Sequence, residues 1–254
     1  MNTFTPQPEM KILAVIPARF GSTRMPGKPI MEILGKPMIQ WVFENVNRVQ
    51  EFAHVVIATD DHRIRRVCES FGAPVIMTSS TASCLIDRLH EVSELMDADY
   101  YISVNGDEPI LESAIMPKIL PDFVDRNMPI VRGLVRDFTD PVEVFDSGNI
   151  KIVVGAGGYS IYASRSPVPY PQKSTQYRFK KYVGVECFNK LALDFYVGNE
   201  PTPIEVIEDI GSIRFLEHGI RIHYTQVESE SLSVDTPKDL NKIINVMKER
   251  GVSP

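Results

Sequence analysis

The sequence predicts an α/β protein: an open, mostly parallel sheet with helices on both faces and a small inserted β-rich region. Two observations predict it. Up to Val104, apolar runs of strand length alternate with amphipathic stretches of helix length, as in repeated strand–helix–strand units. The apolar runs are rich in β-branched residues and lack polar alternation, which is typical of strands buried on both faces of a parallel sheet.

The individual elements follow from these patterns in chain order. We expect strands at 11–16, 55–58, 75–77 and 100–104, separated by helices at 38–49, 61–71 and 87–96. Gly72 marks the end of the second helix, because glycine commonly follows a helix C-terminus. From Pro129 to Val154 the pattern becomes β-like, and further strands are expected at 159–163 and 183–188.

The length suits one large domain. We expect a single domain over residues 11–254, with residues 1–10 as a flexible N-terminal extension and a β-rich region inserted at about 130–200. A proline-rich loop at 166–171 lies in that inserted region. Prolines pre-set such turns without needing a ligand, so a lid, a dimer arm and a plain surface connection all remain open.

Composition excludes several classes of protein. The net charge of −6 argues against a general nucleic-acid binder, which would need a basic surface for its phosphate contacts. The three cysteines are too few and too scattered for a disulfide framework or a Cys-x-x-Cys metal site. The sequence contains no apolar run long enough to span a membrane and no signal peptide pattern at its start. We therefore expect a cytoplasmic protein without membrane or nucleic-acid partners.

The loop that follows the first expected strand is the most informative segment. Residues 17–29 combine glycines, hydroxyls and three cations, namely Gly21, Gly27, Ser22, Thr23, Arg19, Arg24 and Lys28. Glycines let backbone N–H groups approach phosphate, and the cations can neutralise several negative charges together. The spacing is neither that of a P-loop nor that of a dinucleotide fold. The loop predicts a triphosphate clamp, with ordinary solvated loop charges as the alternative.

The motifs resemble those of the sugar nucleotidyltransferases, in particular the cytidylyltransferases that activate 3-deoxy-manno-octulosonate, the acidic sugar of bacterial lipopolysaccharide and capsules. The similar segments run in the family's order from Lys11 to about Met247, at 14–29, 35–39, 55–61, 104–109 and 234–240. The resemblance implies a Rossmann-like nucleotidyltransferase fold and transfer of CMP from CTP to an acidic sugar, with release of pyrophosphate. It also implies a homodimer.

Nucleotidyl transfer needs cations on the leaving pyrophosphate and Mg²⁺ held by carboxylates near the α-phosphate. Asp107 follows the fourth expected strand, and Asp235 precedes an expected helix at Pro237. Since ligands bind at the carboxyl ends of parallel strands, Asp107 and the cationic loop can converge. Asp107 and Asp235 are the predicted Mg²⁺ ligands. The alternatives are an Asx turn for Asp107 and a helix N-cap for Asp235.

The resemblance assigns roles residue by residue. Arg19, Ser22 and Lys28 match triphosphate positions, and Arg88 matches an arginine that helps to bind the nucleotide. We expect Arg19, Lys28 and Asp107 to carry catalysis. The expected nucleotide-binding set is Arg19, Gly21, Ser22, Thr23, Lys28, Arg88 and Asp107. The residues before Arg88 depart from the family pattern, because an apolar Cys-Leu-Ile stretch at 84–86 replaces Ser-Gly-Thr.

The acceptor side departs further from the family. Tyr182 and Glu186 stand where the family has histidine and tyrosine, and Gly-Ser at 211–212 replaces Glu-Gln. Losing hydrogen-bond partners for sugar hydroxyls often changes the substrate. Arg165 and Arg214 are candidates for pairing with an acceptor carboxylate. The predicted acceptor-binding set is Arg165, Tyr182, Glu186, Ser212 and Arg214.

Three interpretations stay open at the level of sequence. The acceptor is 3-deoxy-manno-octulosonate or a modified analogue such as an 8-amino form, for which Glu186 is a candidate partner. A second interpretation is a nucleotidyltransferase for a different acidic acceptor. A third is a non-catalytic homologue that binds nucleotide and regulates a partner, prompted by the apolar stretch at 84–86.

Overall fold

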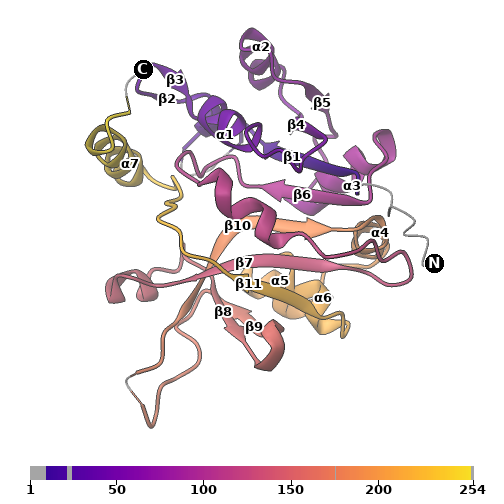
Figure 1. Cartoon of the computed structure of the whole chain (residues 1–254), viewed down its shortest axis with the longest axis vertical. Helices are drawn as coiled ribbons and strands as arrows, with labels where there is room; N and C mark the ends of the chain where they lie inside the picture. The colour runs from indigo at the N-terminus through magenta and orange to yellow at the C-terminus, as the bar shows by residue number, and fades with distance from the viewer. Residues whose placement is uncertain (1–9, 22–24, 175, 253–254) are drawn as a thin grey trace, which may run out of the picture.

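The computed structural model describes residues 10–21, 25–174 and 176–252. In these residues nine strands form one twisted sheet, with helices packed on both of its faces (Figure 1). The strands are β1 (Ile12–Ala18), β4 (His54–Thr59), β5 (Val75–Met77), β6 (Tyr100–Val104), β7 (Val131–Asp137), β8 (Lys151–Val154), β9 (Ser160–Ser164), β10 (Lys180–Phe188) and β11 (Ile222–Gln226). A separate hairpin joins β2 (Glu32–Ile33) to β3 (Lys36–Pro37).

Helices fill most of the connections between the strands. The α-helices are α1 (Met38–Val46), α2 (His62–Ser70), α3 (Leu85–Leu95), α4 (Lys190–Val197), α5 (Pro203–Glu208), α6 (Ile213–Glu217) and α7 (Pro237–Glu249). Short 3₁₀ turns lie at η1 (Lys28–Ile30), η2 (Ser113–Ile119), η3 (Pro141–Phe145) and η4 (Ala156–Gly158). No helix of the described residues is both long and apolar enough to cross a membrane.

The strand order places a topological switch point beside β1. The sheet reads β11-β7-β10-β6-β1-β4-β5, so the chain leaves β1 toward β4 and β5 and then returns to add β6 on the other side. The pairs β1–β4, β1–β6 and β4–β5 are parallel, whereas β10 is antiparallel to its neighbours β6, β7 and β8. Ligand sites in such sheets lie outside the carboxyl ends of the strands at the switch point.

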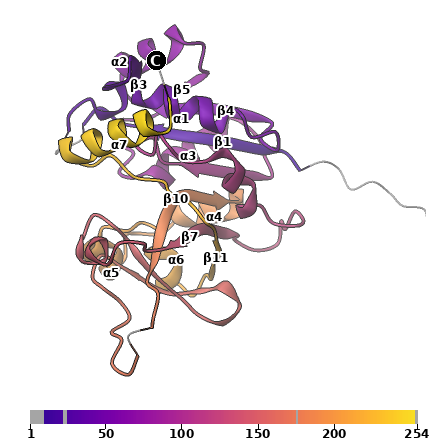
Figure 2. The same ribbon diagram turned by 60° about the vertical axis from the view of Figure 1, so that its left-hand side comes forward.

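Alternate residues of β1 feed two hydrophobic cores. Ile12, Ala14 and Ile16 face α1, α2 and η2, whereas Leu13 and Val15 face α3, α4 and α6. All five side chains are at most 2 % exposed. A third cluster packs α7 against α1 and the β2–β3 hairpin, which brings the C-terminal helix back to the N-terminal half (Figure 2).

The expected strands and helices of the first half are present. The strands at 55–58 and 75–77 correspond to β4 and β5, and the strand at 100–104 to β6. The third helix begins at Leu85, two residues before the expected start, because the Asp87 carboxylate accepts hydrogen bonds from the backbone of Ser83 and Cys84. Residues 130–200 supply β7 to β10, but β7 and β10 join the central sheet, and β8 and β9 extend from β10.

Candidate active site

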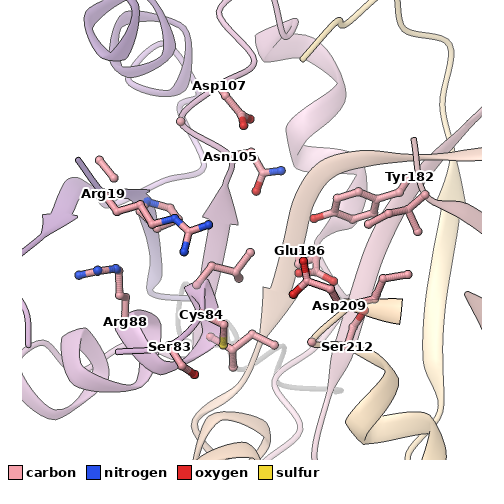
Figure 3. Close-up of a pocket in the computed structure, with 18 of the residues that line it drawn as sticks. Arg19, Ser83, Cys84, Arg88, Asn105, Asp107, Tyr182, Glu186, Asp209 and Ser212 are labelled. Atoms are coloured by element: carbon pink, nitrogen blue, oxygen red, sulfur yellow. The ribbon is translucent and has the colours of Figure 1, made fainter. Parts of the chain in front are cut away.

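One cavity opens at the carboxyl ends of β1 and β6, at the switch point of the sheet. Its volume is about 430 Å³, within the range of small-molecule sites. Segments far apart in the sequence line it, as Figure 3 shows: Arg19 and Arg88 on one side, Asn105 and Asp107 above, and Tyr182, Glu186, Asp209 and Ser212 opposite. The cavity therefore has a cationic end and an end rich in hydroxyls and carboxylates.

Lys28 links the two carboxylates predicted from the sequence. Its Nζ lies 2.6 Å from Asp107 Oδ2 and 3.4 Å from Asp235 Oδ1, and it also donates to the Val234 carbonyl at 2.8 Å. The helix α7 begins with Thr236 as N-cap, whose hydroxyl accepts from the backbone N–H of Asp239. Asp235 is therefore not the cap of this helix, and its carboxylate faces Lys28 instead.

Asp107 offers an oxygen for a metal ion. Its Oδ1 is buried and has no hydrogen-bond partner within the described part of the chain, whereas Oδ2 accepts from Lys28. Mg²⁺ prefers one or two carboxylates together with phosphate oxygens and water. Asp107 and Asp235 both lie beside the Lys28 ammonium group and line the cavity. These two carboxylates fit the ligands that a bound Mg²⁺ would need.

The other residues expected to bind nucleotide are partly gathered here. Arg19 directly follows β1, is exposed, and lines the cavity. Arg88 also lines it and is 4 % exposed, with its guanidinium 3.1 Å from Asp60 Oδ1 and bonded to Thr78 Oγ1. Gly21 is exposed and is not among the lining residues. Ser22 and Thr23 lie outside the described residues.

The unusual stretch at 84–86 forms the start of α3 at the cavity. Ser83, Cys84, Leu85 and Ile86 all line it. The Asp87 carboxylate accepts from Ser83 and from the Cys84 N–H, while Cys84 Sγ lies 3.4 Å from the Tyr196 hydroxyl. Burial raises the pKa of the Cys84 thiol, so it remains protonated and is not a nucleophile. This stretch shapes the cavity wall with apolar side chains.

The opposite end of the cavity is built around Glu186 on β10. Glu186 is 5 % exposed, and the hydroxyls of Tyr182 and Ser212 are its hydrogen-bonding neighbours. Tyr224 of β11 also lines this end and is hydrogen-bonded to Ser212. Its ring lies over Gly133, where an added Cβ would come within 2.3 Å of Tyr224 Cε1. Only glycine on β7 leaves room for this tyrosine beside Glu186.

Burial controls the ionisation of this cluster. Desolvation raises the pKa of Glu186 to about 7, although the hydroxyls of Tyr182 and Ser212 oppose the shift. Desolvation and the nearby Glu186 also raise the pKa of Tyr182 and of Tyr224, which both stay protonated at neutral pH. Glu186 is therefore the group in this cluster that changes charge near neutral pH.

The two arginines expected to bind an acceptor carboxylate have structural partners. Arg214 is 6 % exposed and does not line the cavity. Its Nε and Nη2 each lie 2.7 Å from a Glu205 oxygen, and Nη1 donates to the carbonyls of Tyr196 and Asn199. Four of its five N–H donors are used within the fold, so the structure does not bring Arg214 to the expected acceptor end of the cavity.

Arg165 does line the cavity, but its donors are also occupied. Its Nε donates to the Glu208 carbonyl at 2.6 Å, and its two terminal nitrogens donate to the carbonyls of Ser147 and Asp209. Arg165 therefore ties β9 to the segment after α5, and it contributes charge to the cavity wall rather than a free guanidinium fork.

Asp209 and Tyr224 are among the lining residues that the sequence analysis missed. Asp209 lines the cavity in the left-handed region at φ 51°, directly after α5, and Tyr224 reaches it from β11. No local motif marks either of them. An aspartate at a helix C-terminus with positive φ and a tyrosine facing a glycine on the next strand are recognisable only once the strands are paired.

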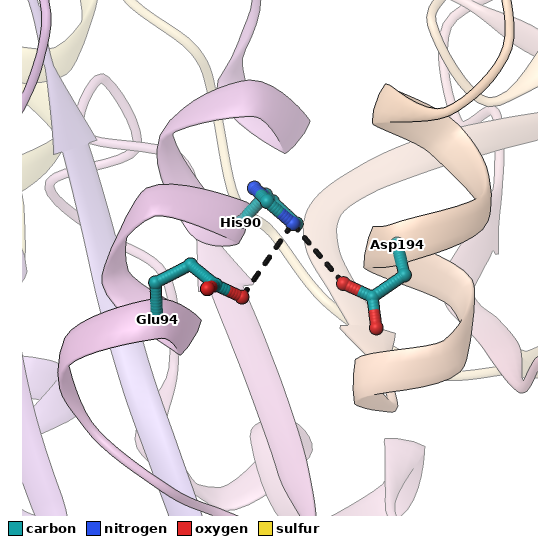
Figure 4. A group of neighbouring side chains, drawn as sticks. All are labelled: His90, Glu94 and Asp194. Carbon is teal, nitrogen blue, oxygen red and sulfur yellow. Dashed lines mark hydrogen bonds and ion pairs between the residues drawn. The ribbon is translucent and has the colours of Figure 1, made fainter.

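A second group of potential metal ligands lies outside this cavity. His90 and Glu94 on α3 face Asp194 on α4, with His90 Nε2 3.1 Å from Asp194 Oδ1 (Figure 4). The Lys190 ammonium contacts both carboxylates, at 2.5 Å from Glu94 Oε1 and in an ion pair with Asp194. Because Lys190 already supplies the positive charge, the group is a link between α3 and α4.

The fold and the site define the class of protein. A sheet that is parallel around β1, with cations after β1, two carboxylates at Lys28 and a mixed polar wall opposite, is the arrangement of a nucleotidyltransferase. The family model for cytidylyltransferases matches residues 13–222. The chain belongs to the cytidylyltransferase family and is an enzyme of that kind.

Known proteins of this family resemble the chain over most of its length. The 3-deoxy-manno-octulosonate cytidylyltransferase of Trichlorobacter lovleyi is 38 % identical, covering 94 % of this chain and 100 % of that protein. The Escherichia coli protein of the same name is 35 % identical, covering 94 % and 97 %. A solved structure of CMP:2-keto-3-deoxy-manno-octonic acid synthetase complexed with CTP matches with a TM-score of 0.87 at 35 % identity, covering 94 % and 99 %. The resemblance drawn from the motifs is confirmed.

Proposed function

We propose that this enzyme transfers CMP from CTP to 3-deoxy-manno-octulosonate or a modified form of that sugar acid, releasing pyrophosphate. The observation that carries the proposal is the single cavity that joins Lys28, Asp107 and Asp235 to a polar wall at Tyr182 and Glu186. One end suits a triphosphate and the other a small polar acceptor. The named relatives, similar over nearly their whole length, act on that sugar acid according to their names.

The reaction is a direct displacement at the α-phosphorus. The acceptor's anomeric hydroxyl oxygen forms the new bond to phosphorus, the bond to the bridging oxygen of the β-phosphate breaks, and the hydroxyl proton is lost to solvent or a nearby base. Arg19, Lys28 and Arg88 neutralise the charge that develops on the phosphates. Asp107 and Asp235 would hold Mg²⁺, which supplies further neutralisation at the α-phosphate when bound. The chain's own role is to position and to neutralise, without a covalent intermediate.

We also propose a biosynthetic role, a cellular compartment and an oligomeric state for this enzyme. Sugar acids activated in this way supply lipopolysaccharide or capsule synthesis, and we place the reaction in the cytoplasm, consistent with three free cysteines. We also propose a homodimer. Exposed apolar side chains on η3 and η4–β9, among them Phe145 at 78 % and Ile161 at 68 % exposure, favour a second copy of the chain as a partner.

The deciding experiment measures pyrophosphate release by the purified protein. CTP would be compared with ATP, GTP and UTP, with and without Mg²⁺, and with octulosonate as acceptor. We expect turnover that needs CTP, the sugar acid and Mg²⁺ together. Turnover only with an unrelated acid would favour a different acidic acceptor. Nucleotide binding without pyrophosphate release for any acceptor would instead indicate a regulatory homologue.

A further inference from the structure

Glu186 is a buried carboxylate that faces a ligand cavity without a cation of its own. It is 5 % exposed, and its neighbours from β10, β11 and the turn before α6 carry hydroxyls. No lysine, arginine or histidine of the described residues is among the groups that act on its pKa. Arg165 lines the same end of the cavity, but it donates to three backbone carbonyls and lies 3.5 Å from Asp209 Oδ2.

The strand register explains why no base approaches Glu186 from its neighbours. Glu186 pairs with Gly133 on β7, whereas Arg132 pairs with Cys187 and so lies on the opposite face of the sheet. His223 pairs with Arg132 on the next strand and shares that opposite face. On the cavity face, the described groups around Glu186 are Tyr182, Ser212 and Tyr224. The register therefore separates the carboxylate from Arg132 and His223.

Burying the Glu186 carboxylate without a counter-ion costs free energy, and the described residues around it supply no such counter-ion. A carboxylate removed from water without a counter-ion costs several kcal/mol. Hydroxyl donors are already present from Tyr182 and Ser212, so what this site lacks is a positive charge rather than another hydrogen bond. Groups of this kind in clefts are candidates for ligand binding. Because the cavity is open to small molecules, the ligand itself can bring that charge.

We propose that Glu186 binds an ammonium group of the acceptor, so that the enzyme prefers an amino-substituted sugar acid to the plain polyhydroxy acid. The proposal rests on the proposed function, since it assigns the acceptor end of a cavity whose other end takes CTP. It makes Glu186 a specificity-determining residue. Tyr182 and Ser212 are positioning residues that hold the carboxylate toward the cavity.

The preference should depend on pH in a defined direction. The pKa of Glu186 is about 7 in the free protein, while an alkyl ammonium has a pKa of about 10. Tyr182 and Tyr224 stay protonated, and Arg165 and Asp209 on the facing cavity wall pair with each other. Burial also raises the pKa of Glu108 to about 7, but Glu108 does not line the cavity and accepts hydrogen bonds from Gly184 and Ser231, so the Glu186→Gln variant identifies which carboxylate sets the pH dependence. Between pH 6 and pH 8 Glu186 loses its proton while the amine keeps its own. The preference for the amine should therefore increase over this range.

The experiment compares kcat/KM for octulosonate with analogues in which one hydroxyl is replaced by an amine, including the 8-amino form, or by hydrogen. CTP and Mg²⁺ are saturating, and pyrophosphate release is measured at pH 6, 7 and 8. For at least one amino analogue we expect kcat/KM at pH 8 to exceed that for octulosonate by about tenfold or more. In Glu186→Gln this ratio should fall by at least tenfold and lose its dependence on pH.

A matched control separates this effect from a general change of charge. Glu94→Gln is the same chemical change at a carboxylate on α3 that does not line the cavity, so the ratio should change less than threefold. If Glu186→Gln does not fold, Tyr182→Phe tests the same carboxylate by removing one of its donors, and the ratio should again shift. Turnover of octulosonate without preference for any amine would overturn this inference and leave the proposed function intact. No turnover with any acceptor would reject both.

Discussion

At the scale of single residues, Lys28 is the side chain that connects the two predicted metal-binding carboxylates to the phosphate-binding end of the site. It lies 15 % exposed between Asp107 and Asp235 and lines the cavity beside Arg19. In the free protein it separates two carboxylates, and with CTP bound it is available to neutralise phosphate charge. The same side chain therefore stabilises the empty site and serves catalysis.

We predict that Lys28→Met lowers kcat/KM for CTP by about 100-fold or more, because a preorganised charge at a developing anion is worth roughly that factor. Steady-state pyrophosphate release measures it. Lys36→Met is the matched control, since Lys36 pairs with Glu44 at 3.1 Å and does not line the cavity. Lys36→Met should stay within about twofold of the original enzyme. A Lys28→Met enzyme that is folded and equally active would contradict the assigned role.

At the scale of elements, a buried ion pair joins α5 to α6. Glu205 on α5 and Arg214 on α6 are 7 % and 6 % exposed and form two parallel hydrogen bonds of 2.7 Å. Tyr196 of α4 adds a third element, because its hydroxyl donates to Glu205 Oε1 at 2.8 Å. These helices carry Asp209 and Ser212 between them, so the pair holds one wall of the cavity in place.

We predict that Arg214→Met lowers the free energy of unfolding by about 3–5 kcal/mol, because Glu205 is left buried without its counter-ion. Urea denaturation measures the change. Arg65→Met is the control: Arg65 forms an exposed pair with Glu69 on α2, and its loss should cost less than about 1 kcal/mol. Unchanged stability together with a large rise in the acceptor KM would show that Arg214 contacts the acceptor after all.

At the scale of the whole molecule, the cavity is assembled from parts that span the chain, from Pro17 to Asp235. A ligand bound there contacts the sheet, α3 and the segment before α7 together. Binding to the folded state alone stabilises it by about 2.7 kcal/mol at a ligand concentration of 100 times Kd. For a protein of this size each kcal/mol raises Tm by roughly 2–4 °C.

We predict that CTP with Mg²⁺ raises Tm by about 5–10 °C and that EDTA removes most of this increase, because Asp107 and Asp235 repel the triphosphate unless a metal ion lies between them and the phosphate oxygens. Differential scanning fluorimetry measures both. UTP and ATP at the same concentration should raise Tm less than CTP. An equal increase with CTP in the presence of EDTA would argue against Asp107 and Asp235 as ligands of the metal ion.

Much of the fold could be predicted because its signals are local. The apolar strand at 11–16 and the helix at 38–49 show their periodicity within a dozen residues, and β1 and α1 lie there. The convergence of Lys28 with Asp107 was also predictable, because both follow strands of a parallel sheet. Arg214 was not, since whether an arginine meets a ligand or a buried glutamate depends on the packing of two short helices.

The sequence by itself determined the sheet type, the cationic loop after the first strand and the family, because these follow from short-range patterns of apolar, glycine and charged residues. Which side chains lie at the acceptor end of the cavity was decided by the tertiary structure. Pairing β10 with β7 and β7 with β11 places Gly133 beneath Tyr224, and it sets Glu186 on the cavity face and Arg132 on the other. Strand register is a long-range property that no local pattern encodes. The sequence offered Glu186 as a candidate partner for an amine, but only the folded molecule shows this carboxylate buried at the cavity and separated from Arg132 by the strand register.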